Sequence, residues 1–145
     1  MSAKSGRKTP RPLDRSSYER LAEFRYVLRH FLIFSENAAL AAGLSAQQHQ
    51  ALLAIKASRE PTRMTAGVLA ERLGIRHHSA VGLLDRLEHK ALVRRQKDAK
   101  DRRRVLVVLT AKAERLLAEL SAAHQRELRR VAPVLRTLLN DLARL

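Results

Sequence analysis

The chain has 145 residues, 46% of them hydrophobic, and it carries 29 Lys and Arg against 14 Asp and Glu, a formal net charge of +15. This length supports one ordinary hydrophobic core, and so large a positive charge favours a polyanionic partner, most often a nucleic acid. Without cysteine, disulfides and Cys-ligated zinc are excluded, and without a long apolar run or an apolar leader we expect a cytoplasmic protein with no membrane partner.

The N-terminal part divides into an arm and a helix. Residues 1–15 are rich in Lys, Arg and Pro and nearly lack apolar side chains, which predicts a disordered basic arm. Over residues 16–42, apolar residues such as Leu21, Phe24 and Leu28 recur at intervals of three and four, which predicts a long amphipathic helix. This helix is longer and more apolar than a small monomeric domain requires, so it indicates a dimer.

Three shorter helices are expected next. Ser45 and Gln48 form a capping box, which predicts a helix to about Ala57. Met64 is expected to add a short third strand before Thr65 caps a further helix. Gly74 supplies the conformation that ends this helix and starts a sharp turn. Another apolar stripe follows the turn, at Ala80, Leu83, Leu84 and Leu87.

Two short helices around a Gly-containing turn are typical of a helix-turn-helix, although a generic helical hairpin fits the spacing equally well. The next segment separates these alternatives. Residues 93–96 and 105–109 are β-prone, and the loop between them, 97–104, holds five cations and two carboxylates. A helix-turn-helix followed by a basic β-hairpin predicts a winged helix, whose narrow tip suits the minor groove of DNA.

The C-terminal part is expected to be helical, starting at a cap on Thr110. Pro133 costs roughly 3 kcal/mol inside a helix, so we expect the chain to kink or restart there, with a final amphipathic helix over 134–145. Leu-rich helices at both ends of the chain indicate termini that intertwine in a homodimer.

The segment from Asp101 to Thr110, with its Asp-x-Arg and an apolar strand that ends in Leu-Thr, resembles the wing signature of MarR-type regulators. Residues 69–75 and 84–88 resemble the same family, and the resemblance extends from about Arg15 to the C-terminus. The chain departs from the family pattern at Ala113, where Gly is usual, and at Arg76, where Ser or Thr usually caps the second helix of the pair.

The resemblance implies a mostly α fold with a small β-hairpin wing. We expect no cofactor. Residues 16–145 would form one domain, with a winged-helix core at about 46–110 and dimerisation helices at about 16–42 and 110–145. It also implies that Arg103 enters the minor groove and that Asp101 orients it; the alternative is a bare surface ion pair.

Candidate DNA-binding residues lie on the second helix of the pair and on the wing. In this docking mode the start of that helix points at base edges. Arg76 and Arg86 suit a bidentate guanine contact or a phosphate clamp, and Gly82 either lets the helix approach DNA closely or is simply tolerated. The full set is Arg76, His77, His78, Ser79, Gly82, Arg86, Lys97, Lys100, Asp101, Arg102, Arg103 and Arg104.

Metal and effector sites rest on the histidines. His77 and His78 diverge by about 100° around a helix, so they cannot easily chelate one ion and no metal site is expected.

The resemblance implies a small apolar or anionic ligand between the dimerisation helices and the DNA-binding unit, although a lone histidine near an apolar face is more often structural. The candidate lining residues are His30, Phe31, Phe34, Asn37 and His49.

These patterns predict a homodimeric, sequence-specific regulator of transcription that binds double-stranded DNA. The family expectation is a repressor of pseudo-palindromic operators that a small-molecule effector releases. A basic architectural protein that coats or bends DNA without choosing a sequence is the alternative. The sequence shows no nucleophile–base pairing, phosphate-binding glycine loop or carboxylate cluster, so we expect no enzymatic activity.

Overall fold

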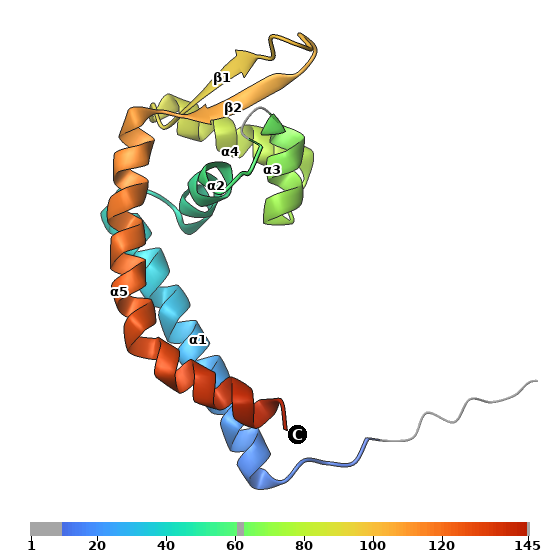
Figure 1. Cartoon of the computed structure of the whole chain (residues 1–145), viewed down its shortest axis with the longest axis vertical. Helices are drawn as coiled ribbons and strands as arrows, with labels where there is room; N and C mark the ends of the chain where they lie inside the picture. The colour runs from blue at the N-terminus through green and yellow to red at the C-terminus, as the bar shows by residue number, and fades with distance from the viewer. Residues whose placement is uncertain (1–9, 61–62, 145) are drawn as a thin grey trace, which may run out of the picture.

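Helices and one β-hairpin make up the computed structural model, which describes residues 10–60 and 63–144. The elements in chain order are α1 (Arg15–Ala41), α2 (Ala46–Lys56), α3 (Ala66–Leu73), α4 (His77–His89), β1 (Val93–Lys97), β2 (Val105–Leu109) and α5 (Ala111–Leu142). The long helices α1 and α5 run side by side, while α2, α3, α4 and the hairpin gather at one end of α5 (Figure 1). The mostly helical fold with a β-hairpin wing is therefore confirmed. Most of the predicted basic arm, residues 1–9, lies outside the described residues.

The helix starts follow their capping residues. Ser45 and Gln48 form the predicted capping box, with 3.1 Å between each backbone nitrogen and the other residue's side-chain oxygen. Thr65 and Thr110 cap α3 and α5 as predicted. The α1 cap is Asp14, which the sequence reading missed; hydrogen bonds from the Ser17 hydroxyl and backbone N–H hold the pKa of Asp14 below its ordinary value.

The core has two separate parts. The larger part joins α2, α3, α4, the hairpin and the first half of α5 around leucines that are almost fully buried: Leu44, Leu52, Leu69, Leu83, Leu84, Leu87 and Leu92. The smaller part lies between α1 and the second half of α5 and consists of Val27, Val131 and Leu138. The winged-helix end is thus well packed by itself, whereas the pair of long helices has little core of its own.

The hairpin is a regular antiparallel ladder, in which Val93 pairs with Leu109 and Lys97 with Val105. Met64 was expected to add a third strand. Its carbonyl accepts one hydrogen bond from the Val107 N–H at 2.8 Å, but among the described residues the sheet has two strands only. One bond aligns the start of α3 with the wing without extending the ladder.

Pro133 does not end the C-terminal helix. The expected restart there is wrong, because α5 continues through Pro133 to Leu142 and bends along its length (Figure 1). Val131 and Leu138, on either side of the proline, are both buried against α1. We infer that this burial keeps the helix continuous despite the lost backbone hydrogen bond.

The turn from α4 into β1 contains a residue in a left-handed conformation. Ala91 has φ of +57°, and it is the one non-glycine residue with positive φ in the described ranges. Its N–H donates to the Glu88 carbonyl, and the Leu92 N–H donates to the Leu87 carbonyl, both at 2.9 Å. Such a turn usually carries glycine, because a Cβ in this conformation costs roughly 1–2 kcal/mol.

We expect Ala91→Gly to raise the free energy of unfolding by about 0.5 kcal/mol, because relief of the strained conformation exceeds the extra entropy of an unfolded glycine. Urea denaturation measures the change. The matched control is Ala57→Gly at the end of α2, where φ is −77°; it should lower the free energy of unfolding by about 0.5–1 kcal/mol. A loss of stability in both variants would contradict the strain at Ala91.

Candidate nucleic-acid interface

Helix α4 presents two different faces. Ala80, Leu83, Leu84 and Leu87 are buried on one side, whereas Arg76, His77, His78 and Ser79 are exposed at its first turn. Arg76 occupies the N-cap position and makes no side-chain capping hydrogen bond, which confirms the missing cap expected from the sequence. The first turn of α4 therefore offers backbone N–H groups and a guanidinium to an outside partner.

Two further candidates lie along the same helix. Arg86 is exposed, and Gly82 is half-buried. A Cβ added at Gly82 would meet only the Arg86 Nη1 atom, at 3.5 Å. Packing within the chain therefore does not require glycine at this position.

The wing tip is held by local hydrogen bonds. The Asp98 N–H donates to the Arg104 carbonyl, and the Arg104 N–H to the Asp101 carbonyl, each at 3.0 Å. Asp101 Oδ1 accepts from the Arg103 backbone N–H at 3.1 Å and from Arg103 Nε at 3.2 Å. Asp101 thus orients Arg103, whose side chain is 92% exposed.

The remaining cations of the wing differ in their surroundings. Arg104 Nη1 lies 3.9 Å from Asp98 Oδ2, and this carboxylate offsets part of the positive charge of Arg104. Lys97, Lys100 and Arg102 are exposed and have no ion pair among the described residues. Residues 59–104 as a whole hold 13 Lys and Arg against 6 Asp and Glu, a net +7, so nearly half of the total charge lies in this part of the chain.

Arg95 is a positioning residue that the sequence reading missed. From β1, its Nη1 donates to Asp85 at 2.6 Å and to Glu88 at 3.2 Å, and its Nη2 donates to the Val81 carbonyl at 3.1 Å, all on α4. The side chain is only 25% exposed. The sequence feature that could have indicated this role is the pair Asp85 and Glu88, three residues apart on a helix that precedes a strand with arginine. These bonds fix the angle between the wing and α4.

The wing, α4 and the start of α3 enclose one cleft of about 600 Å³. His77 lines it from α4, while Arg103 and Arg104 line it from the wing. Thr65 and Gly67 line it from the start of α3, and Arg95 and Val107 line it from the hairpin. The structure therefore brings one predicted residue of α4, His77, to the same cleft as two predicted residues of the wing, about 25 positions later in the sequence. The other candidates on α4 do not line this cleft.

The predicted effector residues do not form one site. Phe31, Phe34 and His49 gather around His124 of α5, with ring centroids 6.1, 5.5 and 4.9 Å from the His124 ring. His30 and Phe31 also line a separate hollow of about 260 Å³ between α1 and α5, and Asn37 is exposed. His124 was not predicted; its ring nitrogens contact the Leu120 carbonyl at 2.6 Å and the Ser35 hydroxyl at 2.7 Å.

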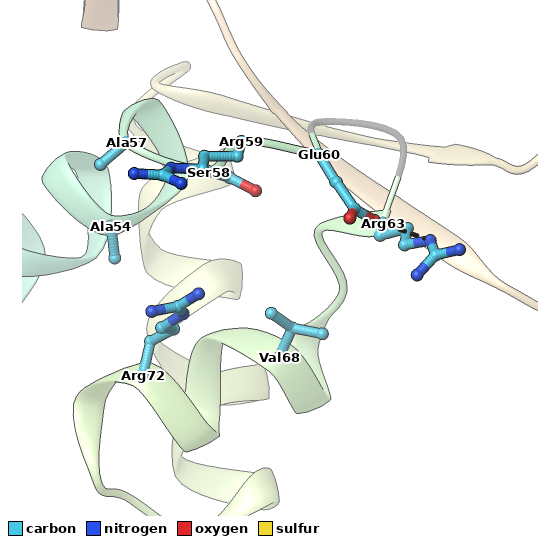
Figure 2. A pocket seen from close by; sticks show the side chains of 8 residues that line it. All are labelled: Ala54, Ala57, Ser58, Arg59, Glu60, Arg63, Val68 and Arg72. Carbon is cyan, nitrogen blue, oxygen red and sulfur yellow. Dashed lines mark ion pairs between the residues drawn. The ribbon is translucent and has the colours of Figure 1, made fainter.

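A basic hollow of about 580 Å³ lies between α2 and α3 and contains none of the predicted residues. Figure 2 shows Arg59, in the loop after α2, and Arg72 of α3 on one side of it. On the other side Glu60 pairs with Arg63 at 2.9 Å. None of the residues that line this hollow lines the cleft between α4 and the wing.

Within residues 10–60 and 63–144, no helix is long and apolar enough to cross a membrane. The same ranges contain no group of three or more His, Asp or Glu side chains that could hold a metal ion.

Comparisons with known proteins point to one family. A model described as MarR family matches residues 42–104. A Bacillus subtilis (strain 168) relative, described as the uncharacterized HTH-type transcriptional regulator YcgE, is 39% identical over 101 residues; the match covers 68% of this chain and 64% of that protein. The chain thus spans less than two thirds of this relative's length.

Two solved structures share the fold. A mutant of MepR from S. aureus, bound to an oligodeoxyribonucleotide, matches with a TM-score of 0.67 and 21% identity, over 80% of this chain and 82% of that one. CouR from Rhodococcus jostii RHA1, bound to p-coumaroyl-CoA, matches with a TM-score of 0.68 and 22% identity, over 89% and 93%.

The burial of His49 makes stability depend on pH. His49 is 6% exposed, and burial, followed by the nearby His124, holds the pKa of His49 below its ordinary value of 6.5. Below pH 6.5 the unfolded chain therefore takes up a proton that the folded protein resists, so the stabilising contribution present above pH 6.5 is lost as the pH falls.

We expect the free energy of unfolding to decrease between pH 6.5 and pH 5, by at most about 1.4 kcal/mol per pH unit for one proton. Urea titrations at several pH values measure the slope. His49→Gln should make it shallower, whereas the control His30→Gln, at an exposed position, should leave it unchanged. Equal slopes in the wild type and His49→Gln would show that His49 is not the cause.

Proposed function

Because the chain belongs to the MarR family, we propose that it is a DNA-binding regulator of transcription that acts as a homodimer on pseudo-palindromic operators. One observation carries the proposal: His77, in the exposed first turn of α4, and Arg103 of the wing line the same cleft. In this arrangement α4 is the recognition helix and enters the major groove, while the wing reaches the adjacent minor groove. The DNA-bound MepR structure supports this partner.

The two long helices support the dimer. Exposed apolar side chains on α1 include Leu28, Leu32, Ile33 and Leu40, and α5 adds Leu139. Apolar surface of this kind on a helix pair with a small core favours burial against a second copy. A two-fold axis there would hold two recognition helices about one DNA turn apart.

We further propose that the regulator is a repressor and that a small apolar or anionic effector releases it from DNA. The ligand-bound CouR structure supports a ligand for this fold. The aromatic cluster around His124 lies where α1, α2 and α5 meet, so a ligand that entered there would act on the dimerisation helices and on α2 together. Among the candidates, the proposal keeps Phe31, Phe34 and His49, whose rings lie near the ring of His124.

The alternative is architectural binding without sequence choice, which the net charge of +15 favours. Selection from fragmented genomic DNA distinguishes the two functions. The full chain is incubated with the fragments at physiological salt with excess competitor, and the retained DNA is sequenced. Enrichment of a few fragments that share an inverted repeat supports the regulator, whereas uniform retention that modest added salt abolishes supports the architectural function.

We expect Arg103→Ala to weaken binding to the selected operator by about 10- to 100-fold, because a groove contact of about 1–3 kcal/mol is lost. Circular dichroism should show an intact fold, since the side chain is almost fully exposed. Arg130→Ala on α5, also exposed, removes the same charge and should change operator affinity by less than about threefold. Unchanged operator affinity in Arg103→Ala would refute the role of the wing.

A further inference from the structure

We propose that Lys90 is the positioning residue that fixes the recognition helix relative to the dimerisation helices, and that it thereby sets the half-site spacing that the dimer accepts in DNA. This inference rests on the proposed function.

Lys90 stands at the C-terminal end of α4, in the C-cap position. Its Nζ donates to the Gly43 carbonyl at 2.7 Å and to Gln48 Oε1 at 3.0 Å, so it bridges α4 to the turn between α1 and α2. No other hydrogen bond joins α4 to α1, α2 or their turn within the described part of the chain. The hydrogen-bonded link between these parts is therefore this one side chain.

Both acceptors are held firmly. Gln48 is buried, and its Oε1 also accepts the Ser45 N–H of the capping box. Gly43 lies in the turn after α1, and its own N–H donates to the Leu40 carbonyl at 2.9 Å. Because both acceptors are held by these contacts, we infer that a displacement of α4 lengthens or breaks the bonds from Lys90.

The same end of α4 is also tied to α5. Lys112 Nζ donates to the Lys90 carbonyl at 3.0 Å, and the Thr110 hydroxyl donates to the Ala91 carbonyl at 2.7 Å. Lys90 thus lies between contacts to α1–α2 and to α5, the helices proposed to form the dimer. Its ammonium faces the α1–α2 turn, whereas residues 76–79, in the exposed first turn of α4, lie at the opposite end of this helix.

The length of α4 amplifies small movements at this anchor. A helix of 13 residues is roughly 20 Å long at about 1.5 Å per residue. A tilt of about 10° at its C-terminal end therefore moves its first turn by roughly 3 Å, close to the rise of one base pair, about 3.4 Å. In a two-fold dimer both first turns move, so the stiffness of the Lys90 link governs how strictly the spacing between half-sites is read.

The test uses the full chain and the operator half-sites that the wild type selects. Inverted repeats are built with the selected spacing and with one base pair removed or added, and the ratio of Kd values between shifted and selected spacing is measured for each variant. We expect Lys90→Met to reduce this ratio about three- to tenfold relative to the wild type, as coupling through a shared contact allows. Lys90→Arg, which keeps the donors and the charge, should restore most of it.

Two controls separate geometry from charge. Gln48→Met removes the acceptor without changing the net charge and should also reduce the ratio. Lys56→Met removes a cation that pairs with Glu114 at 2.7 Å, and it should leave the ratio unchanged. Circular dichroism and thermal melting establish that each variant is folded at the assay temperature.

Three results would overturn the inference. In the first, folded Lys90→Met and Gln48→Met keep the wild-type ratio. In the second, Lys90→Met weakens binding equally at every spacing while Gln48→Met has no effect, which would make Lys90 a simple phosphate contact. In the third, the wild type selects no inverted repeat; this result refutes the proposed function itself, and the inference falls with it.

Discussion

The burial of one face of α4 is the constraint on which the rest of the winged-helix end depends. Leu83, Leu84 and Leu87 are at most 1% exposed, and burial of side chains of this size contributes roughly 1.5–3 kcal/mol each. Because these leucines fix the rotation of α4 about its axis, the opposite face with Arg86 must point outward. Arg95 then sets the wing against that outward face. The cleft between wing and helix follows from these two contacts.

Local features of the fold could be predicted from the sequence because local chemistry determines them. Capping by Ser45, Thr65 and Thr110 depends on atoms within three residues of the cap. The left-handed conformation at Gly74 depends on that glycine alone. Features that depend on distant partners could not be predicted. Pro133 stays inside a helix because of burial against α1, which lies about 100 residues earlier in the chain.

The candidate site divides in the same way. A continuous motif predicted the Asp101–Arg103 contact, which spans two residues. Arg95 and His124 were missed because their partners lie on other elements. Neither residue belongs to a sequence motif that would indicate its contacts. Four of the five candidate effector residues lie on α1 and His49 lies on α2. Which of them come together depends on how α5 packs against both helices. In the folded chain Asn37 is exposed whereas His49 is buried, so the two residues have different environments.

The uncapped start of α4 has a consequence for how this chain can change over time. A Ser or Thr at position 76 would stabilise the helix by about 1 kcal/mol, yet the chain carries Arg76 without a capping hydrogen bond. In the proposed function this guanidinium stands where bases are read, so the most stable residue and the most useful one differ at this position. Natural variants with Ser or Thr at position 76 would be more stable proteins that prefer a different operator sequence. The trade-off between stability and function would then depend on this single residue.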